Sequence, residues 1–457
     1  MAADLINPMR AFFRTGKTVS KRFRRSCLKK LRAVIEANED QILKALKQDL
    51  EKCPVEAYAS ELSFVYAEID HALRYLGGWM RPQKKKTPLF LWPGKSRLYP
   101  EPKGVVLIIG PWNYPFLLVF APLIGALAAG NCAVIKPSEM APHTAQVIED
   151  IITAAADSPH IRVIQGDRSI AEELCELPWD HLFFTGSTRV GHSVMKAASK
   201  NLTPLTLELG GKNPCFVLAD ADLQVAAERI VWGKYLNAGQ TCLAPDIVYV
   251  DKHVSAELSE NILKAIERLY GADPEASPDY GRVQSSRHIE RLAAYVQDVR
   301  ILCGGQYNKE TRYFAPTVVR DVPADSRILS EEIFGPILAI IEFDQLEEQI
   351  EQLRGQPKPL AVYVFSKSRA LQQLVLHRLP SGTACVNDTL KQALSSYLPF
   401  GGIGESGVGQ YHGRASFDCF THYRSIFKTG FRGFRWHYPP YRFDVKFIKK
   451  FMRWFMR

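Results

Sequence analysis

The sequence predicts an α/β fold, with largely parallel sheets covered by helices on both faces. From about residue 104 onward, short β-branched apolar runs alternate with segments long enough to form a helix. Several of these runs are continuously apolar, as expected of strands buried on both sides. The chain has 457 residues, of which 46% are hydrophobic and 23% charged. At roughly 100–200 residues per domain, this length predicts two or three domains, each with its own core.

The first elements are helical and then highly apolar. Residues 18–50 read as a helix, because Leu28, Leu31 and Ile35 recur near helical spacing. Residues 105–129 form the most apolar stretch, but the sequence Gly-Pro-Trp-Asn-Tyr-Pro at 110–115 interrupts it. We therefore expect a strand, a turn and a buried helix there, and not a membrane span.

Two series of strands follow from the β-branched runs. Residues 81–95, with the run Lys84-Lys85-Lys86 and three prolines, look like an exposed excursion, for which a solvated loop is the simplest interpretation. The second series, after Gly211, suggests another domain of similar architecture. The expected strands lie at 104–110, 132–136, 162–166 and 181–184 in the first series, and at 215–218, 247–250, 337–343, 361–365 and 384–386 in the second.

The net charge of +10 is concentrated at the two ends of the chain. Residues 1–32 and residues 424–457 each carry ten Lys/Arg against a single Asp, a net +9 apiece, so the segment between them sums to −8. An acidic body with two basic ends argues against a nucleic-acid partner.

The nine cysteines are scattered from Cys27 to Cys419, without a CxxC pair or a Cys/His cluster at metal-binding spacing. This usage favours a reducing, cytoplasmic compartment and predicts no metal site. The basic N-terminus contains no continuous apolar run, so we expect no signal peptide.

Two turns after predicted strands could bind a nucleotide. Gly186 ends an apolar strand, Ser187 follows it, and Gly191 lies in the first turns of the next helix, where backbone amides suit a pyrophosphate. Lys136 and Glu139 close an earlier strand and could grip ribose hydroxyls. Taken singly, each motif is more often an ordinary turn.

Three further residues could carry chemistry. Cys242 follows small and polar residues and could be a nucleophile, although a free cysteine more often fills a core. Glu208 precedes paired glycines and could act as a base. Asn113 could stabilise an oxyanion or cap the following helix.

Together, and in this order, these motifs resemble the aldehyde dehydrogenase superfamily over nearly the whole chain. Tyr411-His412-Gly413 after the last motif, the short N-terminal region and the total length resemble its class 3 or fatty aldehyde branch. The motifs are PWNYP (111–115), KPSE (136–139), FTGS (184–187), LELGGK (207–212), GQTC (239–242), EEIFGP (331–336) and PFGGIGESG (399–407).

The resemblance implies a Rossmann-type NAD(P)-binding domain, an α/β catalytic domain and a small bridging or oligomerisation element, in a protein that forms a homodimer. The nucleotide-binding domain would comprise residues 1–80 and 102–208, and the catalytic domain residues 209–393. The bridging element would comprise 81–101 and 394–432, followed by a basic amphipathic tail at 433–457.

Roles for the chemical residues follow from the same resemblance. Cys242 would attack the aldehyde carbonyl, the Asn113 amide and the Cys242 backbone N–H would hold the oxyanion, and Glu208 would activate water to hydrolyse the thioester. Glu139 should repel a 2′-phosphate and so favours NAD, although this branch can also accept NADP. The cofactor-binding set is Trp112, Lys136, Glu139, Gly186, Ser187, Gly191, Leu209, Gly210, Glu332 and Phe334.

Arg189 departs from the broader family, because it places a bulky cation in the pyrophosphate turn. It could point to solvent or contact phosphate.

The expected activity is oxidation of medium- or long-chain fatty aldehydes to carboxylic acids, with aromatic or apocarotenoid-type aldehydes as alternative substrates. CoA-acylating oxidation is a rival, but a base at Glu208 favours water as the acyl acceptor. A cysteine hydrolase that works through Cys242 without a nucleotide is a rival from another class, as is a non-catalytic membrane-coat role.

The C-terminal segment 442–457 predicts an amphipathic helix. At helical spacing its Phe, Trp, Met, Ile and Val side chains gather on one side, and only Asp444 breaks the separation from the basic residues. Such a helix fits a peripheral anchor at the cytoplasmic face of a membrane. A helix packed on the body or against a partner is the alternative. The basic face is formed by Lys446, Lys449, Lys450, Arg453 and Arg457.

Overall fold

A six-stranded sheet organises the first half of the chain in the computed structural model, which describes residues 2–156, 159–431, 438–441 and 443–455. All neighbouring strands are parallel except the antiparallel β17–β7 pair at one edge. The strand order reverses beside β3, as in doubly wound nucleotide-binding sheets. The strands, in spatial order, are β17 (Gly407–Val408), β7 (Leu205–Glu208), β6 (His181–Thr185), β3 (Val105–Ile109), β4 (Cys132–Lys136) and β5 (Ile161–Val163).

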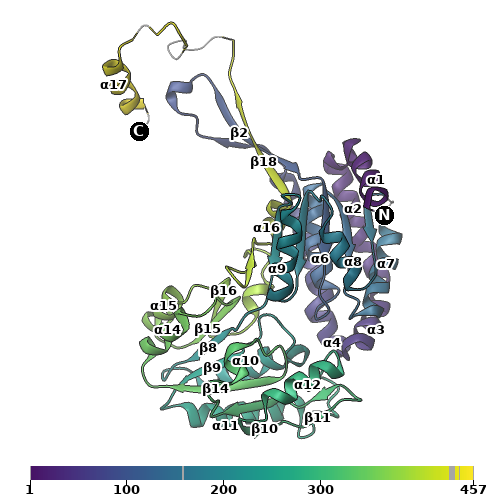
Figure 1. The fold of residues 1–457 in the computed structure, drawn as a ribbon, viewed down its shortest axis with the longest axis vertical. Helices are drawn as coiled ribbons and strands as arrows, with labels where there is room; N and C mark the ends of the chain where they lie inside the picture. Colours follow the sequence, from purple (N-terminus) through teal and green to yellow (C-terminus); the bar gives the residue numbers. More distant parts are fainter. Residues whose placement is uncertain (1, 157–158, 432–437, 442, 456–457) are drawn as a thin grey trace.

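Helices cover both faces of this sheet (Figure 1). Strand β3 shows why its run is continuously apolar: Val106 and Ile108 enter one core, whereas Val105, Leu107 and Ile109 enter another on the opposite face. On the first face lie α6 (Leu117–Ala129) and α7 (Pro142–Ala155), backed by α2 (Lys21–Ala37), α3 (Glu39–Leu50) and α5 (Ser63–Trp79). On the second lie α1 (Ala2–Arg14), α8 (Arg168–Cys175) and α9 (Thr188–Ser199).

A seven-stranded sheet organises the second half, and its strands are parallel except for the β10–β13 pair. The predicted strands of the second series all lie in it, whereas β10 and β13 were not predicted. Its order is β10 (Arg300–Cys303), β13 (Thr317–Arg320), β14 (Ile337–Phe343), β9 (Ile247–Asp251), β8 (Pro214–Val217), β15 (Ala361–Phe365) and β16 (Thr383–Val386).

Helices flank this sheet as well. Its core side chains divide between two clusters, one on each face. The covering helices are α10 (Leu223–Tyr235) and α11 (Ser255–Tyr270), together with α12 (Ser286–Tyr295), α14 (Leu346–Arg354) and α15 (Arg369–Arg378). The shorter elements are α4 (Pro54–Ala57), α13 (Arg327–Ser330), β11 (Tyr307–Asn308) and β12 (Tyr313–Phe314).

A three-stranded antiparallel sheet projects from the body as an arm (Figure 1). It consists of β1 (Gln83–Lys85), β2 (Lys95–Pro102) and β18 (Thr421–Lys428), and α16 (Gly413–Cys419) leads into β18. The solvated-loop interpretation of residues 81–95 is therefore wrong. Strand β1 pairs with β2, and β2 pairs in turn with β18, which lies more than 300 residues away in the chain, so no local pattern reveals the complete sheet.

The helix predicted at 18–50 is in fact two helices. Asn38, with φ −120° and ψ 17°, ends α2 and begins α3, and its side-chain amide donates to the Val34 carbonyl at 2.7 Å. Residues Lys17–Val19 form a separate 3₁₀ turn before the Ser20 cap. The apolar spacing continues through the break, which explains the overlong prediction.

The C-terminal helix α17 (Val445–Phe455) lies beyond the arm and apart from the body (Figure 1). The Asp444 carboxylate, which interrupted the predicted apolar face, accepts from the Phe447 N–H at 2.7 Å at the helix start. Residues 442, 456 and 457 of the predicted tail helix lie outside the described part. Within the described residues, no helix is long and apolar enough to cross a membrane.

A buried ion pair joins the outer helices to the turn after β3. Lys52 Nζ lies 2.6 Å from Glu61 Oε1, and both side chains are 0% exposed. The second Glu61 oxygen accepts from the backbone N–H groups of Phe116 and Leu117 at the start of α6, at 2.9 and 3.2 Å. The ammonium also lies 4.0 Å from the centre of the Tyr114 ring. Each charge therefore has several partners that replace water.

Replacing Lys52 with methionine should destabilise this half of the molecule, because it leaves the Glu61 carboxylate buried without its cation. Removing one partner of a buried pair costs about 3 kcal/mol or more. Urea denaturation measures the change in the free energy of unfolding. Lys44→Met, at an exposed lysine of α3, is the matched control and should change the free energy of unfolding by less than about 0.5 kcal/mol. Equal stability of Lys52→Met and wild type would contradict this role.

Candidate active site

A cleft of about 710 Å³ opens at the carboxyl ends of β3 and β6, where the strand order of the first sheet reverses. The structure brings almost the whole predicted site together here, from six separate segments of the chain. Gly191 is the exception. The predicted residues that line the cleft are Trp112, Asn113, Lys136, Glu139, Gly186, Ser187, Glu208, Leu209, Gly210, Cys242, Glu332 and Phe334.

Gly191 instead packs α9 against β7. A Cβ at this position would lie 2.7 Å from a methyl carbon of Leu209, closer than side chains tolerate. The glycine therefore allows the helix to approach the strand whose end carries Glu208. Gly191 therefore contributes to the packing of the elements that form the cleft, but it does not line the cleft.

A second, largely apolar cavity of about 490 Å³ reaches Cys242 and is lined also by the exposed residues Val55 and Leu394. We call this cavity the funnel. The funnel and the cleft share Cys242, Leu118, Phe400 and Tyr411 in their linings, so they meet at the thiol. Apolar side chains from several helices form most of the funnel wall, including those of Val55, Phe64, Leu117, Trp232, Leu236, Leu243 and Leu390.

The loop before Cys242 has an unusual backbone. Asn237, Ala238 and Gly239 have φ values of 52°, 50° and 74°, which only glycine adopts without cost. Gln240 holds the loop in place, since its side-chain amide donates to the carbonyls of Asn237 and Arg282, both at 3.0 Å. This arrangement sets Cys242 between the two cavities.

Asn113 connects the first domain's turn to this loop. Its side-chain Nδ2 donates to the Gln240 carbonyl at 3.0 Å, while its own carbonyl accepts from Lys52 Nζ at 3.0 Å and from Asn237 Nδ2 at 2.8 Å. Asn113 does not cap the following helix, because Glu61 satisfies the first N–H groups of α6. Of the two roles left open for Asn113, capping is therefore excluded.

Glu208 lies at the end of β7 and is 3% exposed. Neither of its carboxylate oxygens has a hydrogen-bond partner within the described structure. Burial raises the pKa of this carboxyl well above its usual value. A buried carboxyl without partners, facing the cleft beside Cys242, is suited to accept a proton from a bound molecule.

Cys242 is neutral at pH 7 in this environment. Burial, followed by the nearby Glu332 and Glu208, raises the pKa of its thiol to about 12. The pKa of the Glu332 carboxyl is itself raised to about 7, by burial and by the nearby Asp246. The two acids and the thiol thus share a low-dielectric site, where each disfavours negative charge on the others.

The donor set of the cleft fits a dinucleotide. Lys136 is buried and lies 2.6 Å from the half-exposed Glu139, which leaves a cation and a carboxylate beside each other for ribose hydroxyls. Ser187 caps the 12-residue helix α9, whose free N–H groups begin at the cleft. A Cβ on Gly210 would lie 2.1 Å from a Glu332 oxygen, so only glycine leaves the space between them. No cluster of metal-ligating side chains occurs among the residues that the structure describes.

Sequence reasoning missed His288 and Arg291, which also line the cleft. Arg291 donates to the carbonyls of Ile333 and Phe334 at 2.8 and 3.3 Å and so supports Phe334 in its left-handed conformation, with φ 45°. The His288 ring lies 5.3 Å from that of Trp112, which in turn lies 5.4 Å from that of Phe334. Both missed residues belong to α12, and no local motif marks them. Arg189 is exposed and lines the cleft.

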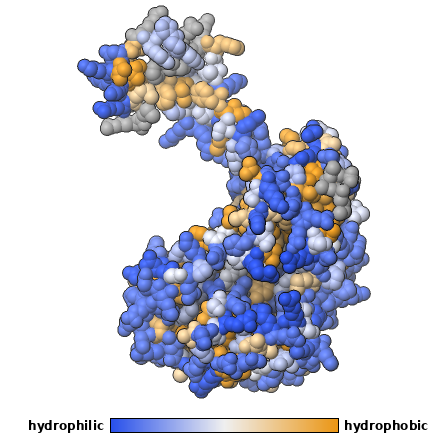
Figure 2. Space-filling view, viewed as in Figure 1, coloured by the Kyte–Doolittle hydropathy of each residue, from blue (hydrophilic) through white to orange (hydrophobic). Residues whose placement is uncertain are grey.

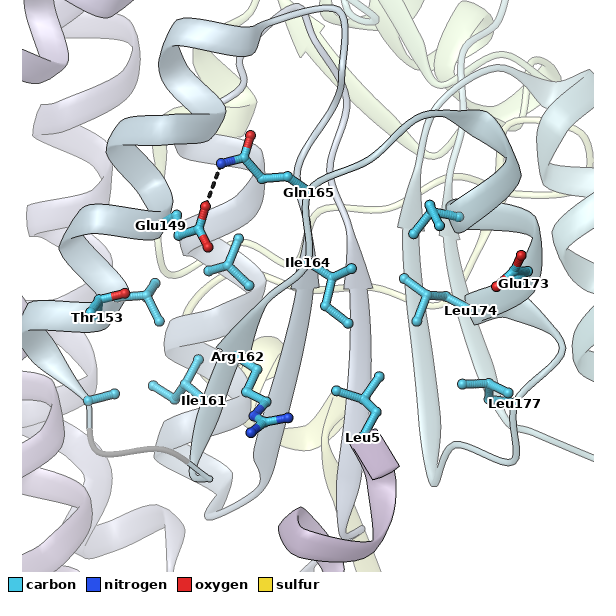
Figure 3. Close-up of a pocket in the computed structure, with 14 residues that line it drawn as sticks. Leu5, Glu149, Thr153, Ile161, Arg162, Ile164, Gln165, Glu173, Leu174 and Leu177 are labelled. Carbon is cyan, nitrogen blue, oxygen red and sulfur yellow. Dashed lines mark hydrogen bonds between the residues drawn. The ribbon is translucent and has the colours of Figure 1, made fainter. Parts of the chain in front are cut away.

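Another hollow, of about 680 Å³, lies beside the edge strand β5 (Figure 3). Its wall includes Leu5, Thr153, Arg162 and Leu177, contributed by α1, α7, β5 and the segment after α8. It contains none of the residues predicted to carry chemistry. We therefore assign the site to the cleft and the funnel.

Alkylation of Cys242 by iodoacetamide should accelerate as the pH rises from 7 to 10, because the raised pKa keeps the thiolate a minor species. Glu332→Gln should increase the rate at pH 8, because removing the Glu332 charge lowers the pKa of the Cys242 thiol. The gain should fade below pH 7, where Glu332 in the wild type becomes protonated. Mass spectrometry of the Cys242 peptide measures the rate.

Glu331→Gln is the control for this experiment, because Glu331 pairs with Arg327 on the surface. If Glu332→Gln and Glu331→Gln alkylate at the wild-type rate, the electrostatic account of Cys242 is wrong.

The family model for the aldehyde dehydrogenase family matches residues 2–426 of the chain. The 4,4'-diaponeurosporen-aldehyde dehydrogenase of Staphylococcus aureus is 45% identical over 97% of both chains. Aldehyde dehydrogenase family 3 member A2 of Mus musculus is 41% identical over 94% of this chain and 90% of the relative.

Solved structures agree with these relatives. The substrate-bound state of Staphylococcus aureus AldH has a TM-score of 0.96 and 44% identity, with 99% of both chains covered. An indole-3-acetaldehyde dehydrogenase in complex with NAD⁺ has a TM-score of 0.85 and 26% identity, with 93% of this chain and 89% of that chain covered. The expected fold class is thus confirmed, and the chain belongs to the aldehyde dehydrogenase family, in its class 3 branch.

Proposed function

We propose that the protein oxidises medium- or long-chain apolar aldehydes to carboxylic acids, with NAD as cofactor and NADP as the less favoured alternative. The observation that carries the proposal is the position of Cys242, at the junction of a nucleotide-shaped cleft and an apolar funnel. An aldehyde entering through the funnel would present its carbonyl to the thiol, while the cleft holds the cofactor on the other side.

In the first step, the Cys242 thiol loses its proton to the Glu208 carboxylate, which passes it on to water. Cys242 Sγ adds to the aldehyde carbon, and the carbonyl π bond opens to an oxyanion. The Asn113 side-chain amide and the Cys242 backbone N–H stabilise that oxyanion. Asn113 is positioned for this role, because its side-chain amide already donates to the Gln240 carbonyl in the loop before Cys242. An incoming oxyanion would compete with that carbonyl for the same donor.

The cofactor, when bound, supplies the acceptor for the hydride that leaves the former aldehyde carbon. Lys136 and Glu139 would bind its adenosine ribose, the start of α9 at Ser187 its pyrophosphate, and Glu332 its nicotinamide ribose. Glu139 favours NAD, since its carboxylate would repel a 2′-phosphate.

Glu208 would then take a proton from water. The hydroxide adds to the thioester carbon, and the C–S bond breaks to release the carboxylic acid and Cys242. The raised pKa of Glu208 supports this role, because it makes the carboxylate a stronger base than an exposed glutamate.

The funnel supports a long apolar substrate. Its wall combines aliphatic and aromatic side chains with few polar groups, so each added methylene is removed from water. Apocarotenoid-type aldehydes are a second candidate class, favoured by the relative whose name gives such an aldehyde as its substrate. Both classes are long and apolar, and they differ in rigidity.

The decisive assay is NADH formation with aldehydes from acetaldehyde to hexadecanal. We expect kcat/KM to rise roughly threefold to fourfold per methylene until the funnel is filled, at ~0.8 kcal/mol each. Cys242→Ser should abolish NADH formation, whereas Cys215→Ser, at a buried cysteine of β8, should retain the chain-length preference. A flat response to chain length would refute the substrate class, and activity in Cys242→Ser would refute the mechanism.

We also propose that the protein is a homodimer. Among the described residues, no strand pairs with the outer edge of β16 in the seven-stranded sheet, where Val386 is exposed, or with the outer edge of β18 on the arm. An open edge is a template for a strand from another chain. Pairing of β18 with β16 of a second copy would close both edges.

Light scattering after size exclusion tests the dimer. Two chains of 51.5 kDa predict a particle of about 103 kDa. A proline at Arg424, near the centre of β18, removes a backbone donor and should shift the mass toward the monomer. A monomeric wild type would contradict the proposal.

We propose, finally, that α17 binds the cytoplasmic face of a membrane peripherally. Phe443 and Phe447 are exposed and stack with ring centres 4.8 Å apart, while Lys446, Lys449 and Lys450 are exposed as well. An apolar face opposite a basic face is typical of interfacial helices. This contact would hold the protein at the surface in which long apolar aldehydes dissolve.

A further inference from the structure

The far end of the arm is a second surface suited to a membrane. We propose that the arm tip, residues 84–95, docks on an anionic lipid bilayer through an apolar turn surrounded by lysines. The proposal extends the membrane contact proposed for α17, but it stands on different residues and can fail separately.

The arm tip exposes large apolar side chains at its extremity. In the turn between β1 and β2, Leu89 is 55% and Trp92 62% exposed. Phe427 of the neighbouring β18 is 47% exposed, and its ring covers Gly94, where any Cβ would clash with it. Single exposed apolar residues are ordinary, but a cluster at the end of a projecting hairpin marks an interaction surface. Tryptophan and leucine are among the residues that enter the lipid interface.

The turn is held in one conformation by its own hydrogen bonds. The N–H groups of Leu91, Trp92 and Gly94 each donate to the carbonyl three residues earlier, at 2.8–3.0 Å. The Thr87 hydroxyl bridges to β2, where it accepts from the Ser96 N–H at 2.9 Å. Leu89 and Trp92 are therefore presented without an ordering step, which reduces the entropic cost of binding.

The charge around the turn has a single sign. Residues 81–98 and 425–431 contain no Asp or Glu. We call residues 81–98 and 425–431 the outer arm. Glu101, nearer the body, is paired with Arg424 at 2.8 Å and so does not neutralise the cations of the outer arm. Within the described residues, no ion pair engages the cations of the outer arm. They are Arg81, Lys84, Lys85, Lys86, Lys95, Arg97 and Lys428.

The arm tip and α17 lie at the same end of the long axis of the molecule, away from the catalytic body (Figure 1). Figure 2 shows hydrophobic residues beside hydrophilic ones over this end. Both elements thus combine exposed aromatic residues with lysines, the pattern that anionic headgroups attract and the interface retains. Two contacts would also restrict how the protein is oriented on the surface, which one helix cannot do.

Lipid fits this surface better than protein does. A protein partner would need to supply carboxylates for seven cations and a pocket for Leu89 and Trp92, whereas an anionic bilayer supplies both at once. Each lysine near such a surface contributes about 1 kcal/mol, a roughly fivefold change in affinity.

The test uses full-length protein and vesicles of phosphatidylcholine with or without about 30% phosphatidylglycerol. Leu89→Ser/Trp92→Ser should weaken binding to the anionic vesicles at least tenfold, and Lys84→Gln/Lys85→Gln at least fivefold. Lys44→Gln/Lys47→Gln on α3 and Leu202→Ser, an exposed leucine after α9, are the matched controls and should stay within twofold. NADH formation with a short, soluble aldehyde confirms that each variant is folded.

The variant Phe443→Ser/Phe447→Ser separates the two membrane contacts. If it weakens binding while both arm-tip variants bind like wild type, the arm-tip proposal is overturned and the α17 contact stands. If the arm-tip variants alone lose binding, the proposal holds and the α17 contact fails. A change of oligomeric mass in Leu89→Ser/Trp92→Ser with unaltered vesicle binding would assign the arm tip to a second copy instead.

Discussion

The buried Lys52–Glu61 pair is the interaction on which the site depends. Glu61 fixes the first turn of α6, while Lys52 binds the Asn113 carbonyl, so the two charges together set the turn that follows β3. Asn113 then reaches across to the Gln240 carbonyl and receives a hydrogen bond from Asn237. A pair of charges with no access to water thereby aligns the nucleotide-binding half with the Cys242 loop, and neither half alone contains a complete site.

Burial also sets the reactivity of the site. Cys242, Glu208 and Glu332 all have raised pKa values because burial disfavours their charged forms. A neutral thiol is protected from oxidation while the site is empty. The Glu208 carboxyl, which has no partner of its own, is left to accept a proton. The left-handed backbone at Asn237 and Ala238 is the strain that accompanies this placement.

The sequence predicted much of this arrangement, because apolar runs and glycine turns are local signals. Local motifs predicted the turn after β3, the turn at Gly186 and the loop before Cys242 one by one. Other features depend on partners distant in the chain. The arm needs β18 to pair with β2, Gly191 packs where it was expected to bind, and Arg291 acts through the Phe334 backbone. The break at Asn38 was missed because the apolar spacing runs through it.

Trapping of the acyl-enzyme tests the central claim most directly. When Glu208→Gln is mixed with NAD and hexadecanal, the account predicts one equivalent of NADH and a protein heavier by one hexadecanoyl group. Peptide mapping should place that group on Cys242, because thioester formation proceeds while its hydrolysis is slowed. An acyl group on another residue, or a burst of NADH with no gain in mass, would contradict the account.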